Sequence, residues 1–129
     1  MDCERWQVFG EQALRAIGKS GHDATIAFVS DRQIKILNKR FRGLDKPTDV
    51  LSFPAGDDEF AKTSKPSLGD IAISVERAQS QGQENNLGFE KEIAQLILHG
   101  LLHLCGYDHE TDKGEMNRLE LRLRDQMGV

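Results

Sequence analysis

Three of the four histidines of this chain fall within one short stretch, HGLLHLCGYDH. His99 and His103 are four residues apart, so on a helix their side chains lie one turn apart on the same face. Gly106 is a residue type that ends helices, and a turn there would bring His109 back toward the same point. Three imidazoles around one ion leave a fourth tetrahedral position for water, as in catalytic zinc sites. The spacing therefore predicts a metal centre held by His99, His103 and His109.

The same spacing occurs in the zinc-protease motif H-E-x-x-H-x-x-G-x-x-H, with one difference. Gly100 stands where that motif has its glutamate, and glycine cannot accept a proton from water. The residues thus predict the metal site without the base of the proteases. We expect zinc, and another divalent transition metal is the alternative, because imidazole also binds nickel, copper and iron. Cys105 is a further candidate ligand, although we interpret it as a small apolar residue that fills space.

Length and composition are those of a small globular protein. The chain has 129 residues, of which 38% are hydrophobic and 29% are charged, which predicts one domain over residues 1–129. No apolar stretch of about 18 residues is present, so we expect no membrane span, and the polar N-terminus is unlike a signal peptide. The two cysteines, Cys3 and Cys105, do not make a disulfide framework, which favours a reducing compartment and a cytoplasmic location.

The net charge of −4 argues against a protein that binds nucleic acid over its whole surface. Cationic side chains nevertheless cluster in one region. Five of them lie close together: Lys35, Lys39, Arg40, Arg42 and Lys46. Taken alone, such a run is equally well explained as the solvated face of a helix. Beside a metal centre, it favours contacts with phosphate groups.

Hydrophobic spacing predicts the elements that position these residues, in the order α-β-α-β-β-α-α-α. The expected helices cover residues 2–19, 31–41, 75–85, 90–104 and 112–127, and the expected strands cover 25–29, 49–53 and 71–74. This order implies the α/β (α+β) class, with a small mixed sheet of three to four strands covered by helices. The metal site is predicted on the helix 90–104 and the turn after it. The charged residues of the last helix are expected on its solvated sides: Glu115, Arg118, Glu120, Arg122 and Arg124.

Several further segments carry a joint pattern that is more specific than the histidines alone. They are Leu37-Asn38, Phe41-Arg42-Gly43, Asp45-Lys46-Pro47-Thr48-Asp49-Val50-Leu51-Ser52-Phe53-Pro54, Leu68-Gly69-Asp70-Ile71 and the stretch from His99 to His109. With these segments in this order, the chain resembles the YbeY family of bacterial rRNA-maturation endoribonucleases. Family members usually begin with a strand before the first helix, whereas this chain starts almost directly at the helix. The sheet is therefore expected to have three strands instead of four.

The resemblance implies an activity and a set of partners. It implies single-strand-directed RNA cleavage, a role in maturing the 3′ end of small-subunit (16S) rRNA, and ribosome quality control. The implied partners are single-stranded RNA and rRNA, and through them the small ribosomal subunit and its proteins. His99, His103 and His109 match the family's metal ligands, and Arg42 matches its functional arginine.

Roles for the remaining candidates follow from their chemistry. The planar guanidinium of Arg42 suits a phosphodiester, whose transition-state charge it would offset, while the metal would lower the pKa of a bound water or polarise a phosphoryl oxygen. The other cations of the run, Lys35, Lys39, Arg40 and Lys46, would guide the RNA backbone. Asp70 and Asp108 are candidates for orienting imidazole N–H groups, and turn or capping roles explain both equally simply. Asp49 we interpret first as a turn residue.

Two other functions fit part of the pattern. A non-catalytic, metal-stabilised module that binds rRNA or a ribosomal protein would explain the missing base. A metal-dependent hydrolase of peptides would explain the protease-like spacing, but it would need a base elsewhere and leaves the basic run without a role.

Overall fold

The structure, a computed structural model, describes residues 3–55, 67–107 and 114–129. Its elements follow the predicted order: α1 (Cys3–Ile17), β1 (Asp23–Val29), α2 (Asp31–Arg42), β2 (Val50–Pro54), β3 (Ser67–Ser74), α3 (Val75–Glu84), α4 (Phe89–Leu104) and α5 (Glu115–Met127). Among these helices, none is both long enough and apolar enough to cross a membrane.

The three described strands form one mixed sheet in the order β1-β3-β2. β3 lies in the middle, parallel to β1 and antiparallel to β2. This confirms the predicted α+β class and the smaller of the two predicted strand numbers. β3 begins at Ser67, four residues before the predicted strand, because pairing with β1 and β2 extends it over first residues of weak strand preference, which include Gly69. That glycine has φ +136°, and a Cβ there would lie 2.1 Å from the carbonyl oxygen of Phe53, so only glycine lets β2 and β3 pair this closely.

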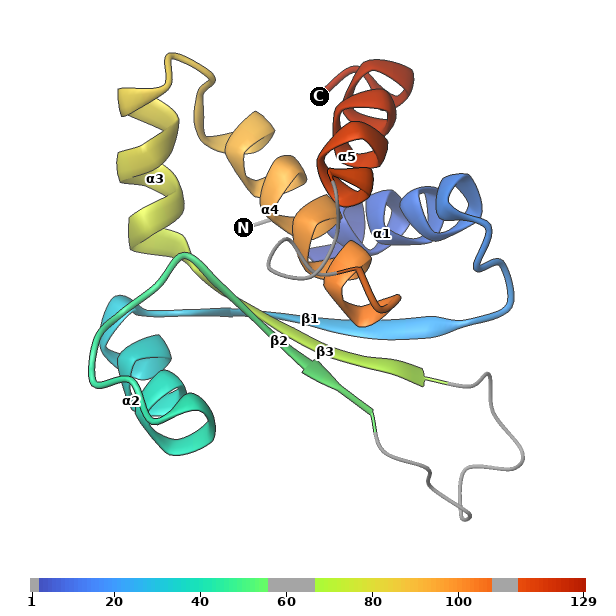
Figure 1. Cartoon of the computed structure of the whole chain (residues 1–129). Coiled ribbons are helices and arrows are strands. Elements are labelled where there is room, and N and C mark those ends of the chain that lie inside the picture. The colour runs from blue at the N-terminus through green and yellow to red at the C-terminus, as the bar shows by residue number, and fades with distance from the viewer. Residues whose placement is uncertain (1–2, 56–66, 108–113) are drawn as a thin grey trace.

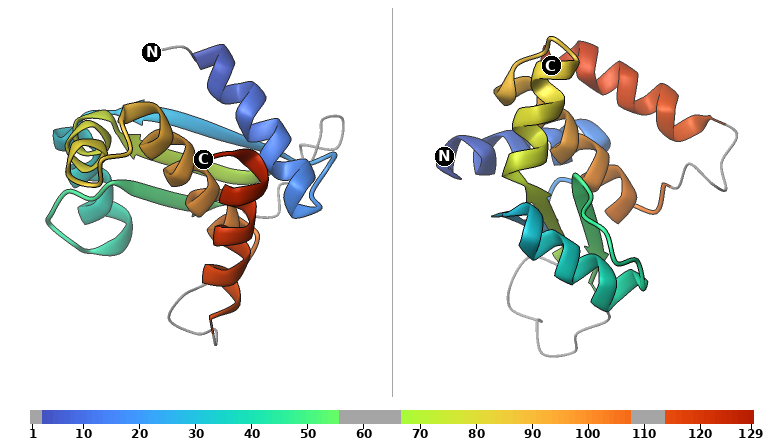
Figure 2. Two further views of the ribbon diagram at one scale, coloured as in Figure 1. Left: turned by 90° about the horizontal axis from the view of Figure 1, so that it is seen from above. Right: turned by 90° about the vertical axis from the view of Figure 1, so that its left-hand side faces the viewer.

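Alternating side chains of β3 build two unequal cores on the two faces of the sheet. Ile71 and Ile73 belong to the large core shared with α1, α4 and α5, whereas Ala72 belongs to a small core with Ile34 of α2. The ribbon views agree: α2 covers one face, and the other helices gather on the opposite side (Figure 1, Figure 2). The helix that carries His99 and His103 is therefore separated from α2 by the sheet.

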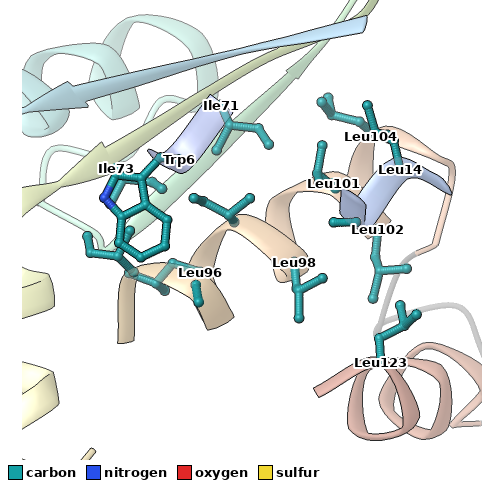
Figure 3. Close-up of a cluster of buried hydrophobic side chains, with 14 of the residues drawn as sticks. Trp6, Leu14, Ile71, Ile73, Leu96, Leu98, Leu101, Leu102, Leu104 and Leu123 are labelled. Atoms are coloured by element: carbon teal, nitrogen blue, oxygen red, sulfur yellow. The ribbon is translucent and has the colours of Figure 1, made fainter. Parts of the chain in front are cut away.

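α4 is the centre of the large core (Figure 3). Ile93, Ile97 and Leu101 of this helix have no exposed surface, and each such side chain contributes roughly 1.5–3 kcal/mol when it is removed from water. Because α4 is buried along most of its length, its orientation is set by packing on both the sheet and α5. The positions of its histidines are thus fixed by the best-packed element of the protein.

α2 begins and ends at residues suited to those positions. The Ser30 hydroxyl accepts from the backbone N–H of Gln33, whose side chain accepts from the backbone N–H of Ser30, so the two form a capping box. Gly43 ends the helix with φ 71°. The predicted cap of α5, Asp112, lies outside the described residues.

Candidate metal centre and the adjoining groove

His99 and His103 converge as their spacing predicts. Both rings project from the same side of α4, and their Nε2 atoms are 3.1 Å apart, with the ring planes at 76°. Gly106, with φ 96°, follows the helix end and donates its N–H to the carbonyl of His103, as expected for a helix-stopping glycine. His109 and Asp108 lie outside the described residues, so the third predicted ligand stays a prediction.

The geometry of the two imidazoles fits a shared transition-metal ion. Two nitrogens bound to one tetrahedral zinc at its usual bond length lie about 3.3 Å apart. The separation of the two Nε2 atoms, 3.1 Å, is close to this value. An imidazole pair of this kind is also a nitrogen donor set that zinc prefers. Metal binding itself is a prediction that rests on this fit.

Glu120 of α5 is the neighbour that orients His99. Its carboxylate Oε1 lies 3.2 Å from Nδ1 of His99 and 3.5 Å from the guanidinium of Arg124. A hydrogen bond donated by Nδ1–H to this carboxylate fixes the ring's tautomer and leaves Nε2 free of a proton, which is the form that binds a metal. Only 4% of Glu120 is exposed, so the prediction that it lies on a solvated side of the last helix is wrong.

The sequence contains a signal that could have identified Glu120. On α5 the buried residues are Met116, Glu120 and Leu123, which follow one another at helical spacings of four and three. The glutamate therefore sits in the apolar stripe and not beside it. A lone acid within such a stripe needs a buried partner, and a histidine of the metal site is the partner that the fold supplies.

Gly100 is explained by packing against the sheet. A Cβ at this position would lie 3.0 Å from two side-chain atoms of Ile71, so a larger residue would force β3 and α4 apart. The Ser52 hydroxyl of β2 donates to the carbonyl oxygen of Gly100 at 3.2 Å, which ties the outer strand to the same point of the helix. At the position where zinc proteases have their catalytic base, this chain thus has a glycine that packs against the sheet.

Cys105 follows the end of α4 and is partly buried. Burial raises the pKa of its thiol, an effect that the charge of Lys19 opposes. A raised pKa disfavours the thiolate in the metal-free protein. The interpretation of Cys105 as a residue that fills space therefore stays a prediction, as does the three-histidine ligand set.

A cavity beside His99 meets a second cavity at a common wall. The larger, of about 640 Å³, lies between α3, α4 and α5 and is lined by His99 and Glu120. The smaller, of about 390 Å³, is lined by Arg42. Asp49 and Gln81 line both cavities, so the two adjoin at these residues. The two adjoining cavities, one lined by His99 and the other by Arg42, are together called the groove.

The basic run divides between this groove and another surface. Arg42 and Lys46 line the smaller cavity, where the buried Asn38 side chain donates to the carbonyl oxygen of Lys46 at 2.9 Å and holds the loop in place. Lys35, Lys39 and Arg40 lie on the exposed side of α2 and border a separate depression of about 700 Å³. One cation of this second group, Lys39, lies 3.9 Å from Asp45.

Asp70 is not brought to the histidines. It is exposed on β3, and strand alternation directs it to the face opposite Ile71, which is the residue that contacts α4 at Gly100. Asp49 is the acid that does line the groove. One of its oxygens accepts from the N–H of Val50 at 2.8 Å, which is the turn chemistry that we predicted. Its second oxygen faces Gln81, and the sequence did not predict this contact.

A hydrogen-bonded polar cluster forms the wall where the two cavities meet. With the Gln81 side chain oriented so that its amide nitrogen faces the two carboxylates, which is the orientation that satisfies its hydrogen bonds, it donates to Glu92 at 3.0 Å and to Asp49 at 3.3 Å. Burial raises the pKa of Glu92 above its ordinary value, and the charge of Asp49 adds to this rise. The nearby Asn85 side chain and Arg124 act in the opposite direction. Only 6% of Glu92 is exposed, so this acid belongs to the interior edge of the groove.

Fold and site together define a class of protein: a small α+β protein in which one buried helix presents paired imidazoles, with His99 lining a polar cavity that adjoins a second, mainly basic one. The family model described as Endoribonuclease YbeY matches residues 4–128. The chain belongs to this family. It is 43% identical over 112 residues to "Endoribonuclease YbeY" of Clostridioides difficile (strain 630), covering 84% of this chain and 73% of that protein.

Two further relatives support the assignment. The chain is 46% identical over 120 residues to "Endoribonuclease YbeY" of Koribacter versatilis (strain Ellin345), covering 93% of this chain and 74% of the relative. The solution structure of TM1509 from Thermotoga maritima is similar with a TM-score of 0.64 and 31% identity, covering 99% of this chain and 85% of that chain. Each relative extends beyond the matched region. The predicted family resemblance is therefore confirmed.

Proposed function

We propose that the chain is a metal-dependent endoribonuclease that cleaves single-stranded RNA and acts in maturing the 3′ end of small-subunit (16S) rRNA and in ribosome quality control. The observation that carries this proposal is that the cavity at Arg42 adjoins the cavity at His99. Arg42 and His99 come from elements on opposite faces of the sheet, yet their cavities share the walls formed by Asp49 and Gln81. Membership of an endoribonuclease family supplies the substrate class.

The residues along the groove would have different roles in RNA cleavage. His99 and His103, with His109, would hold the ion, and Glu120 would keep the Nε2 atom of His99 available to it. When bound, the ion supplies an activated water or polarises a phosphoryl oxygen. Arg42 binds the non-bridging oxygens of the scissile phosphodiester and offsets the charge that develops on them. Lys46 lines the same cavity and attracts the adjoining phosphate.

The division of the basic run suggests a path for the rest of the RNA. Lys35, Lys39 and Arg40 lie outside the groove on α2, so they would contact phosphates several nucleotides away from the one bound by Arg42. Contacts of this kind contribute affinity that falls with salt concentration. The proposed partners are therefore single-stranded RNA, rRNA and the small ribosomal subunit with its proteins, in the cytoplasm.

A digestion series tests the proposal. The purified protein is incubated with single-stranded RNA, duplex RNA of the same sequence, and casein, each with and without a chelator and with zinc added back. We expect cleavage of single-stranded RNA that the chelator removes and zinc restores, with little cleavage of duplex and none of casein. Cleavage of casein in place of RNA would overturn the proposal in favour of the peptide hydrolase.

One observation favours a second candidate, a metal-stabilised module that binds rRNA or a ribosomal protein without cleaving it. Position 100 holds a glycine packed tightly against Ile71, so the base that zinc proteases have at this position is absent here. The chelator again separates the two candidates. An enzyme loses cleavage and keeps its fold and RNA affinity, whereas a module loses its helical circular dichroism and its RNA affinity together.

A further inference from the structure

The wall between the two cavities carries acceptor groups that the proposed chemistry does not use. The Gln81 amide donates to one oxygen each of Glu92 and Asp49, at 3.0 and 3.3 Å, and its own carbonyl oxygen remains an acceptor. The carboxylates add only acceptors when ionised. This wall therefore matches a ligand that brings hydrogen-bond donors.

One carboxylate oxygen of Glu92 is an acceptor without a partner among the described residues. Its Oε2 atom is buried, and within the part of the chain that the structure describes it has no hydrogen-bond partner. Glu92 nevertheless lines the larger cavity, although only 6% of the residue is exposed. Buried carboxylate oxygens are normally satisfied, so an orphaned one at the edge of a groove indicates a place for a ligand.

The chemistry of the neighbouring cavity limits what that ligand is. Arg42, Lys46 and Arg77 line the smaller cavity and suit a phosphate. A phosphodiester has no donor of its own, and its charge is repelled by carboxylates. In a nucleic-acid strand the group next to the phosphate is the sugar, and the ribose of RNA carries a 2′-hydroxyl donor that deoxyribose lacks.

We propose that Glu92 and Asp49 form a binding site for a ribose 2′-hydroxyl, so that this wall selects RNA over DNA while Arg42 holds the adjoining phosphate. The inference rests on the proposed function, because it needs a nucleic-acid strand in the groove. Sites built to bind a hydroxyl reject the analogue that lacks it, since the buried acceptors are then left without a partner.

Competition between oligonucleotides tests the site in the metal-loaded protein. Initial rates of cleavage of a labelled single-stranded RNA are measured with unlabelled competitors of one sequence: RNA, DNA and 2′-O-methyl RNA. The methylated strand keeps the RNA sugar pucker but cannot donate. We expect RNA to compete about ten-fold better than either analogue. Equal competition by RNA and 2′-O-methyl RNA would overturn the inference.

Substitutions in the wall test whether the preference for RNA over DNA arises there. Glu92→Gln replaces a charged acceptor by a weaker neutral one and should lower the ratio of RNA to DNA competition about three-fold, and Asp49→Ala should lower it further. Glu84→Gln is the matched control, because Glu84 is an exposed acid that lines the same cavity. If Glu92→Gln does not fold, Asp49→Ala still tests the site. An unchanged ratio of RNA to DNA competition in the folded variants would overturn the inference. An equal increase in competition by RNA and by DNA would overturn it as well.

If the proposed function is wrong, the experiment gives a different result from the one expected if only the 2′-hydroxyl site is wrong. In that case the wild-type protein cleaves no RNA, and none of the competitors can be ranked by cleavage. Anisotropy of the labelled strands then measures binding directly. If RNA and DNA bind without preference the site is absent, whereas selective binding of RNA without cleavage retains the site and rejects only the enzyme.

Discussion

The two halves of the groove differ in how they are built. The half around His99 is formed by helices that pack on the large core, and its polar groups are partners of one another: Glu120 contacts His99, and Gln81 joins Glu92 to Asp49. The half around Arg42 is formed by the exposed end of α2 and the loop after it. One half is preorganised by burial, and the other presents charge to solvent.

This difference suggests a division of tasks. Groups that must hold an ion need fixed angles, which only a packed scaffold supplies. Groups that attract a long polyanion work through charge and tolerate movement. Changes in the buried half should therefore affect metal content, tautomers and stability, whereas changes in the exposed half should affect RNA cleavage and its salt dependence alone.

The largest effect is expected from His103→Ala. Loss of one imidazole removes a ligand from a three-histidine site, so metal content should fall from about one ion per chain to near zero and cleavage should be lost. Elemental analysis and an RNA digestion measure both. His22→Ala is the control, because His22 lies in the turn before β1 and should leave both values unchanged. Retention of a full metal equivalent by His103→Ala would show that the ligand set is wrong.

Arg42→Ala should affect only the exposed half. We expect cleavage to fall by about 10²–10³-fold, since a donor that offsets transition-state charge is removed, while metal content and thermal stability remain. The matched control is Arg40→Ala on the same helix, because Arg40 borders the other depression. It should reduce cleavage only slightly, and the reduction should be smaller at high salt, where contacts between cations and phosphates are screened. Equal effects of the two variants would remove the distinction between groove and outer surface.

Glu120→Gln should weaken the metal site without destroying it. The amide cannot accept from Nδ1–H as strongly as the carboxylate, so metal affinity should fall by about 10–100-fold. Competition with a chromogenic chelator measures this affinity. Asp125→Asn, an exposed acid on the same helix, is the control. An unchanged affinity in Glu120→Gln would mean that the 3.2 Å contact does not orient His99.

The smallest effect concerns pH. Burial raises the pKa of Glu92 in the folded protein above its ordinary value of 4.5, so the folded state binds a proton that the unfolded state has released. Stability is therefore lost as pH rises from about the ordinary value through the raised pKa. Glu92→Gln lacks this loss, so denaturation between pH 4 and pH 8 should show the variant gaining stability relative to the wild type. A constant difference across that range would contradict the raised pKa.

Much of the site followed from local patterns. The i, i+4 spacing of His99 and His103 predicted their convergence, because helix geometry alone decides it. The helix-ending role of Gly106 and the turn role of Asp49 are equally local. The element order was predicted for the same reason, since hydrophobic spacing reflects which face of each element is buried.

What escaped prediction depends on contacts between distant segments. Glu120 was misplaced because its partner is on another helix, and β3 is longer than predicted because pairing with two strands overrides the weak strand preference of its first residues. Likewise, no spacing rule joins Gln81 to Glu92 and Asp49. Their side chains meet only after α3 packs beside α4 and β2 lies along β3.

The amino-acid sequence by itself determined the family, the order of elements and the pair of imidazoles, because these are properties of short segments. The tertiary structure decided which acid orients His99, that Gly100 packs tightly against Ile71, and that the cavity of Arg42 adjoins the cavity of His99. The reason is physical: burial and packing act between residues far apart in the chain, and they select partners that no local pattern specifies.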